Sequence, residues 1–232
     1  MTTHTLVRES LLDAAAAVLP VRCAGCRRPD RALCDACDAA LRPQPAVHDI
    51  GGVPVFTALT YEGVARRVLL AYKDGGRADV ARALARALRC AIVEAQARSA
   101  GRAGAPDALL PVLIPSTRAA WRRRGYHPTR AVLARAHILV PPLWRALRLS
   151  RQTADQAGLT ASERSGNRDG SMVASARLAG RDCLIVDDIV TSGATIAEAT
   201  RAIRSVGGQV AAAAAIARTP RRRATVLQAA PS

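Results

Sequence analysis

The sequence predicts an α/β fold in which a mostly parallel sheet is flanked by helices, with a small zinc module at the N-terminus. Three observations lead to this prediction. Short apolar runs of strand character alternate with segments of helical periodicity, and this alternation is typical of parallel sheets. Four cysteines fall in one short segment near the N-terminus. The chain has 232 residues, half of them apolar, which is enough for one large domain and a small module.

The first residues predict a short amphipathic helix at 5–19, ahead of the cysteines. The apolar stretch LLDAAAAVLP has the length of a signal-peptide core, but Asp13 interrupts it and no clear small-residue cleavage site precedes Cys23. These flanks favour an amphipathic helix over a signal peptide. We see no run of 18 apolar residues. The sequence therefore predicts no membrane span, and a cytoplasmic location.

The four clustered cysteines predict a structural zinc site. Cys23, Cys26, Cys34 and Cys37 form two C-x2-C pairs separated by seven residues. Each pair can place two thiolates on one side of an ion, and tetrahedral zinc takes four such ligands at about 2.3 Å. Two disulfides or a redox dithiol are the alternatives, but disulfides are disfavoured in the cytosol. Four cysteine ligands leave no open position for chemistry, so we expect a structural metal.

The rest of the chain divides into a linker, an α/β domain and a tail. The N-terminal helix and the cysteine module occupy residues 1–42. Proline and glycine mark residues 41–52 as a linker. The α/β domain covers residues 53–218, and the basic residues 219–232 form a tail that we expect to be frayed.

Strand and helix patterns alternate within the first half of this domain. VPVFTALTY is rich in β-branched and aromatic residues, and predicts a strand. Two stretches of helical periodicity follow, and the turn signal DGG separates them. The expected elements are a strand at 53–61, helices at 62–72 and 77–98 around the turn at 74–76, a loop at 99–106 and a buried strand at 107–115.

The second half continues the alternation. An arginine-rich segment follows Pro115, and the segment LWRALRL fits either a strand or a helix. Residues 151–172 have little periodicity and many polar and glycine residues. The expected elements are a loop at 116–128, a helix from there to about residue 140, the strand CLIVDD at 183–188, a helix at 195–206 and a last buried strand at 209–218.

Positive charge is concentrated in one part of the chain. The net charge is +16, and Lys73 is the only lysine among 34 basic residues. Residues 111–150 hold eight arginines and no acidic residue. Such a block suits a polyanion, either a nucleic acid or a phosphorylated small molecule. The alternative is a solvated basic face that only improves solubility.

The stretch DCLIVDDIVTSGAT predicts a site for a sugar phosphate. Asp187 and Asp188 lie at the carboxyl end of an apolar strand, where ligands bind in parallel sheets. The turn at 191–195 leads into a helix, and its amides, its hydroxyls and Gly193 suit a phosphate. The two carboxylates suit the vicinal hydroxyls of ribose, or Mg²⁺. The alternative is that the aspartates merely end a strand and that a threonine caps the helix.

The stretch CLIVDDIVTSGAT resembles the phosphoribosyl pyrophosphate motif of type I phosphoribosyltransferases. Three further motifs, YKDGGR, PSTRAAWRRRGY and QTADQAGLTASERSGN, follow the four-cysteine segment in the order seen in the ComF competence family. The likeness covers residues 9–218. It departs from the family's usual pattern at Asp74, where a basic residue is usual, and at His127 and Pro128, where Asn-Gln is usual. It also departs after Asn167, where RDGSMVAS lacks the expected aromatic residue.

The resemblance implies roles for individual residues. Asp187 and Asp188 would be the catalytic pair that holds the ribose hydroxyls. The 5-phosphate would bind to Thr191, Ser192, Gly193, Ala194 and Thr195. Arg118, Arg122, Arg123 and Arg124 would lie near the pyrophosphate. The segment with Gln156, Arg164 and Asn167 resembles a mobile loop of the family.

Three hypotheses of function follow. The first is a Mg²⁺-dependent phosphoribosyltransferase, in which an unidentified acceptor displaces pyrophosphate through an oxocarbenium-like transition state. The second is a competence factor for DNA uptake that binds single-stranded DNA and keeps the sugar-phosphate site as a sensor or relic. The third is an adaptor whose zinc module docks a protein of the competence machinery.

Overall fold

The central element of the structure is a five-stranded sheet with the strand order β1-β2-β7-β6-β3. The structure is a computed structural model, and it describes residues 21–99, 109–137, 145–150 and 170–220. All neighbouring strands are parallel except β1, which pairs antiparallel with β2 at one edge. The strands are β1 (Ala46–Ile50), β2 (Val53–Thr60), β3 (Leu110–Leu113), β6 (Asp182–Val190) and β7 (Gln209–Arg218).

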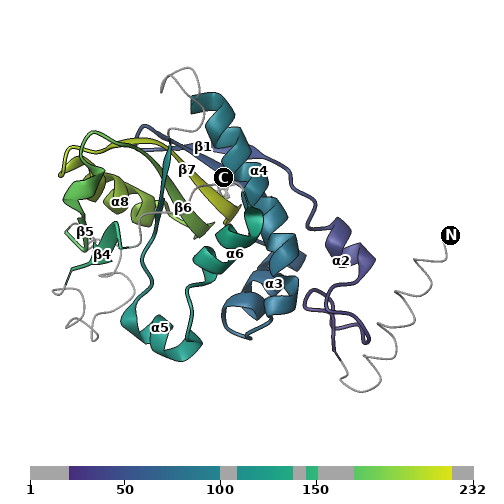
Figure 1. Cartoon of the computed structure of the whole chain (residues 1–232). Coiled ribbons are helices and arrows are strands. Elements are labelled where there is room, and N and C mark those ends of the chain that lie inside the picture. The colour runs from purple at the N-terminus through teal and green to yellow at the C-terminus, as the bar shows by residue number, and fades with distance from the viewer. Residues whose placement is uncertain (1–20, 100–108, 138–144, 151–169, 221–232) are drawn as a thin grey trace, which may run out of the picture.

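Helices cover both faces of this sheet, which confirms the predicted α/β fold (Figure 1). On one face α4 (Ala81–Ser99) packs across β2 and β7. The same apolar layer includes α3 (Gly63–Lys73) and α6 (Pro128–Ala136). The other face is covered by α8 (Ala194–Arg204). A short 3-10 helix, η1 (Ala78–Val80), lies between α3 and α4.

The three inner strands, β2, β7 and β6, supply apolar side chains to both layers. In β6, Leu184 and Val186 belong to the layer under α4, whereas Cys183 and Ile185 belong to the layer under α8. In β7, the alanines at 212–215 also alternate between the two layers. Because a sheet covered on both faces must bury its side chains on both, central strands read as continuous apolar runs. This is why the sequence predicted β6 and β7 well.

The predicted linker at 41–52 is wrong, because its second half forms β1. Gly51 and Gly52 have φ values of +60° and +80°, and together they make a two-residue turn that pairs Ile50 with Val53. Consecutive residues with positive φ form the tight turn that suits a β-hairpin. Since β1 is an edge strand with mostly exposed side chains, it lacks the apolar run from which an inner strand can be predicted.

The arginine-rich segment predicted as a loop at 116–128 contains a helix, α5 (Arg118–Arg124). The Thr117 hydroxyl caps it by accepting from the Ala120 amide at 3.1 Å. Gly125 ends it with a φ of +72°. None of its residues is buried. The helix therefore shows no apolar periodicity, and the prediction missed it for that reason.

A second, two-stranded sheet lies beside α8. The ambiguous segment LWRALRL contributes the strand β4 (Leu147–Leu149), which pairs antiparallel with β5 (Met172–Ala174). The sequence did not predict β5. A short 3-10 helix, η3 (Ala176–Leu178), leads from it toward β6. The predicted helix at 5–19, the aperiodic residues 151–169, residues 221–232 of the tail and most of the loop at 99–106 lie outside the described residues.

An ion pair between the buried Glu198 and the partly exposed Arg201 holds this small sheet to α8. Glu198 accepts from the Met172 amide at 2.8 Å, and Arg201 donates to the Met172 carbonyl at 3.0 Å. The two side chains also pair with each other at 2.7 Å. Burial raises the pKa of Glu198, but the hydrogen bonds from Arg201 and Met172 outweigh burial and lower it. The pair therefore fixes the position of β5 on α8.

None of the helices in the described part of the chain has the length and apolar character needed to cross a bilayer.

Candidate functional site

The candidate site lies at the carboxyl edge of the sheet, where β3 and β6 separate. The β3–β6 pairing ends at Leu113 and Val186. After β3 the chain turns to α5 and α6, whereas after β6 it turns to α8 on the opposite face. Ligands of parallel sheets bind where neighbouring connections diverge in this way. Asp187 and Asp188 stand at this point, and β6 continues beyond them to Val190.

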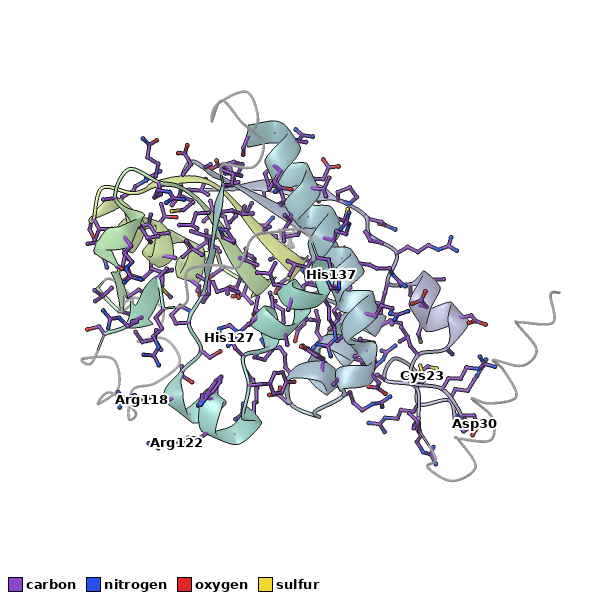
Figure 2. The ribbon with its side chains drawn as sticks, in the orientation of Figure 1. Cys23, Asp30, Arg118, Arg122, His127 and His137 are labelled. Carbon is purple, nitrogen blue, oxygen red and sulfur yellow. The ribbon has the colours of Figure 1, made fainter. Side chains whose placement is uncertain are left out.

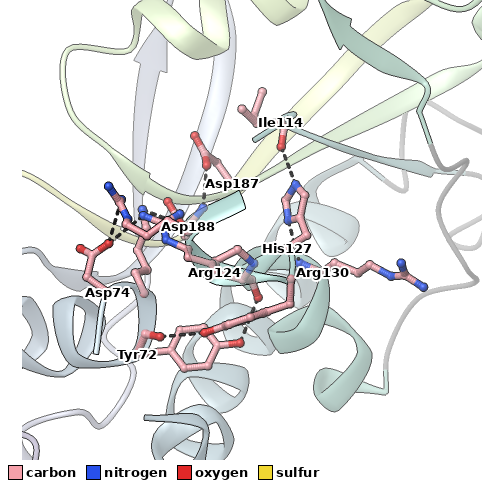
Figure 3. Close-up of polar contacts among 12 residues, drawn as sticks. Tyr72, Asp74, Ile114, Arg124, His127, Arg130, Asp187 and Asp188 are labelled. Carbon is pink, nitrogen blue, oxygen red and sulfur yellow. Dashed lines mark hydrogen bonds and ion pairs between the residues drawn. The ribbon is translucent and has the colours of Figure 1, made fainter. Parts of the chain in front are cut away.

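The two aspartates have different partners (Figure 3). The Asp187 carboxylate accepts a hydrogen bond from the Asp188 amide at 2.8 Å. Asp188 forms an ion pair of 2.8 Å with Lys73, the last residue of α3. The side chains of this pair are only 13% and 20% exposed. The sequence alone did not predict a role for Lys73, although this residue is the only lysine of the chain.

Burial and charge set the protonation of Asp187. Burial raises the pKa of its carboxyl, and the neighbouring charge of Asp188 raises it further, to about 8. A carboxyl with such a pKa holds a proton near neutral pH and can release it when a cation or a hydroxyl donor arrives. The two carboxyl groups therefore differ in their electrostatic environment, although they are adjacent in the sequence.

The turn after β6 has the form of an anion cradle. Gly193 is the N-cap of α8 with a φ of +87°, and a Cβ there would lie 2.7 Å from Ile50 of β1. Both facts require glycine. Thr191 and Ser192 are exposed, and the Ser192 hydroxyl accepts from the Ala194 amide at 3.4 Å. The N-terminus of an eleven-residue helix thus lies at this turn. The first backbone amides of a helix favour the binding of an anion.

The arginines of α5 divide into two groups. Arg124 and Arg123 reach Asp74, in the loop after α3, at 2.9 and 3.3 Å. The hydrogen bond from Arg124 lowers the pKa of Asp74. The Nε of Arg124 is buried and has no partner among the described residues, so it is a donor left for a ligand or water. Figure 2 shows Arg118 and Arg122 at the outer end of the molecule.

Two tyrosines connect the end of α3 to the segment between α5 and α6. Tyr126 donates to the Tyr72 carbonyl at 2.8 Å, and Tyr72 donates to the Pro128 carbonyl at 3.1 Å. Their rings meet edge to face, with centroids 6.1 Å apart. This connection therefore fixes Lys73 and Arg124 on the same side of the site.

His127, a position at which the sequence differs from the ComF pattern that it resembles, caps α6. Its Nδ1 accepts from the Arg130 amide at 3.3 Å. Its Nε2 lies 3.0 Å from the Ile114 carbonyl and must donate to it, since a carbonyl only accepts. Burial lowers the pKa of this ring, which preserves the neutral form that the cap requires. Pro128 follows at the first helical position, where proline fits a helix. The sequence alone did not predict this capping role.

The predicted cysteine ligands lie together. The Sγ atoms of Cys23, Cys26, Cys34 and Cys37 all lie within 4.8 Å of one another. Cys34 lies 3.7 Å from Cys23 and 3.6 Å from Cys26. Four sulfurs at about 2.3 Å from a tetrahedral zinc would be spaced by about 3.8 Å. Gly25 leaves room for them, since a Cβ there would lie 2.5 Å from the Cys37 sulfur.

The charge state of the cluster also fits a cation. Burial raises the pKa of Cys23, but amide donors at Cys34, Cys26 and Gly25 outweigh burial and lower it to about 6. Burial raises the pKa of Cys37, and the other three thiols raise it further. Four thiolates therefore repel one another unless a divalent cation lies between them.

A hollow of about 390 Å³ lies elsewhere, beside Asp49, Arg98 and Ser99. It is near the amino-terminal ends of the strands and contains none of the groups described above.

We expect one zinc ion per chain, bound by the four cysteines. Replacing Cys34 by serine should release the zinc and unfold the module, because Cys34 contacts two of the other three sulfurs. The same change at Cys183, which is buried in β6 away from the cluster, is the control and should retain the metal. Elemental analysis of freshly purified, reduced protein is the measurement. A parent protein without zinc would contradict the assignment.

We expect Asp187 to make the ligand-free protein less stable as the pH rises. Its pKa is about 8 in the folded chain, against an ordinary value of 3.8 for aspartate. The folded state therefore holds the proton more tightly, and this stabilisation is lost as the pH rises from about 4 through about 8. The melting temperature of the parent, measured relative to Asp187→Asn, should fall between pH 5 and pH 9. A constant difference would mean that the carboxyl is ionised throughout.

Comparison with known families agrees with this geometry. Residues 62–229 match the family model of the phosphoribosyl transferase domain, whereas no curated protein matches the sequence. The match covers well over half of the chain and includes both aspartates, the turn after β6 and the arginines of α5. It begins after β2 and therefore leaves the cysteine cluster outside. The chain belongs to the family of proteins with a phosphoribosyl transferase domain.

Proposed function

We propose that the chain binds phosphoribosyl pyrophosphate with Mg²⁺ at the carboxyl end of β6. The observation that carries this proposal is the continuity of two aspartates with a glycine-capped helix. Asp187 and Asp188 directly follow the buried run 183–186 of β6, and the cradle at Thr191–Thr195 begins three residues later. A ribose can place its vicinal hydroxyls on the carboxylates while its 5-phosphate lies on the amides of the turn.

The groups around this core suit the pyrophosphate. Lys73 lies against Asp188. Arg124 is the last residue of α5, and its buried Nε has no acceptor among the described residues. A pyrophosphate entering between them would meet two cations on the side opposite the 5-phosphate cradle. Because Asp74 partly neutralises Arg123 and Arg124, those arginines would have to share or exchange that partner.

The reaction that this site would support is glycosyl transfer. An acceptor would form a bond to the anomeric carbon, and the bond to the pyrophosphate oxygen would break with its electron pair leaving on the pyrophosphate. Mg²⁺ would supply charge to the leaving group. Lys73 and Arg124 would stabilise the same charge from the protein side. The acceptor is unidentified, and the predicted loop residues Gln156, Arg164 and Asn167 lie outside the described residues.

A second candidate function is the binding of single-stranded DNA, in line with the resemblance to the ComF competence family. The observation in its favour is the surface of α5. Trp121 is 49% exposed, and Arg118, Arg122 and Arg123 accompany it on the same short helix. An exposed aromatic ring among arginines is the combination that stacks bases and holds a phosphate backbone.

Changing both Asp187 and Asp188 to asparagine should weaken binding of phosphoribosyl pyrophosphate at least tenfold. Each change keeps the size of the side chain and removes the charge that strengthens its hydrogen bond to a hydroxyl. Such a bond contributes about 1.5–3 kcal/mol. Calorimetry with Mg²⁺ measures the affinity, and circular dichroism measures the fold.

The matched control for this experiment is Asp182→Asn, at the other end of the same strand. It should bind as the parent does. If the double variant also binds as tightly as the parent, the aspartates do not hold the ribose. If the double variant unfolds while Asp182→Asn does not, the aspartates serve the strand end instead.

The two candidate functions predict different effects of changes in α5. Replacing Trp121 and Arg122 by alanine should weaken single-stranded DNA binding and leave phosphoribosyl pyrophosphate binding unchanged, because both side chains are exposed. Arg124→Ala should do the reverse. Each arginine that no longer neutralises a phosphate should reduce the salt dependence of DNA affinity by about 0.7 in the log–log slope. Fluorescence anisotropy at several salt concentrations is the measurement, and unchanged binding of both ligands would leave the helix as a solvated face.

A further inference from the structure

We propose that Arg77 is a positioning residue that makes the phosphoribosyl site depend on the cysteine cluster. The inference rests on the proposed function and adds to it a coupling between two parts of the molecule. Figure 2 shows Cys23 well apart from His127 and from the arginines of α5. The segment Lys73–Arg77 nevertheless contacts both parts.

One end of this segment belongs to the phosphoribosyl site. Lys73 pairs with Asp188 at 2.8 Å. Its neighbour Asp74 accepts from Arg124 at 2.9 Å and from Arg123 at 3.3 Å. The segment therefore supplies one cation of the site directly and sets the position of two others.

The other end belongs to the cysteine cluster. Arg77 donates to the Arg22 carbonyl at 2.8 Å and to the Ala32 carbonyl at 3.3 Å. Arg22 directly precedes Cys23, and Ala32 lies two residues before Cys34. Asp79 holds the same guanidinium at 2.8 Å, so the orientation of Arg77 is fixed. A metal that fixes Cys23 and Cys34 would also fix the two carbonyls to which Arg77 donates.

The residues between these two ends form a tight loop. Arg77 donates its amide to the Ala71 carbonyl at 3.1 Å. A Cβ on Gly75 would lie 2.8 Å from the same carbonyl, and Gly76 has a φ of +65°. The loop is thus folded tightly back on the end of α3. A displacement of Arg77 would therefore be passed to Lys73, only four residues away, rather than absorbed.

Two other arginines join the cluster to the main domain. Arg67 of α3 donates to the Gly25 carbonyl, and it supports the same helix whose last residue, Lys73, pairs with Asp188. Arg86 of α4 pairs with Asp38 at 2.6 Å. It lies outside α3 and the loop after it, and it therefore provides the contrast. Loss of Arg77 and loss of Arg86 should therefore have different consequences.

The first test compares Arg77→Ala with Arg86→Ala, both loaded with zinc. Calorimetry with phosphoribosyl pyrophosphate and Mg²⁺ measures the affinity, and elemental analysis measures the metal. We expect binding to weaken at least fivefold in Arg77→Ala and to change less than twofold in Arg86→Ala. Arg77→Lys keeps the charge but cannot reach two carbonyls with a planar fork, so it should not restore the affinity.

The second test uses the reciprocity of coupled binding. If the metal favours ligand binding, the ligand must favour metal retention by the same factor. Competition with a zinc chelator, with and without phosphoribosyl pyrophosphate, measures that factor. It should exceed one in the parent and in Arg86→Ala, and be smaller in Arg77→Ala.

The outcomes separate the two proposals. A parent that does not bind phosphoribosyl pyrophosphate would overturn the proposed function, and with it the coupling. A parent that binds it, with equal affinities in Arg77→Ala and Arg86→Ala, would overturn the coupling alone. Arg77→Ala could also lose its zinc or unfold. In that case the chelator competition on the parent tests the coupling. Zinc retention in the parent that does not depend on phosphoribosyl pyrophosphate would overturn it.

Discussion

Two adjacent carboxylates at the end of a buried strand are the constraint on which the rest of the site depends. The backbone of β6 holds Asp187 and Asp188 in place, since β7 pairs with it beyond the last contact with β3. Like charges this close cannot both ionise without compensation. Lys73 compensates Asp188, and a raised pKa lets Asp187 keep its proton. A ligand with hydroxyl groups, together with a cation, can replace both forms of compensation.

The loop after α3, together with the last two residues of the helix, is where the elements of the site meet. Tyr72 joins it to the start of α6, Lys73 to β6, Asp74 to α5 and Arg77 to the cysteine module. Six consecutive residues thus contact four different elements. So many contacts from one short segment require a tight backbone, which Gly75 and Gly76 provide. This loop, rather than the sheet alone, determines how the charged groups face one another.

Two positions at which the sequence differs from the ComF pattern that it resembles have local structural roles. Asp74 pairs with Arg123 and Arg124 of α5. His127 caps α6, a role that short polar side chains commonly have at helix N-termini. One ring nitrogen accepts from the Arg130 amide of the helix, and the other donates to the Ile114 carbonyl. Neither change removes a group from the strand end where the ribose is proposed to bind.

The sequence alone determined the α/β class, the inner strands β6 and β7 and the cysteine set, because buried runs and ligand spacings are local patterns. Asp187, Asp188 and Gly193 were also predicted from one continuous stretch. Only the tertiary structure revealed β1, α5 and β5, since an edge strand, a helix without buried residues and a three-residue strand carry little apolar periodicity. It alone brought Lys73 to Asp188, Asp74 to Arg124 and Arg77 to the cysteine cluster. These partners lie about 50 or more residues apart in the chain, and no local pattern records which distant charges a fold brings together.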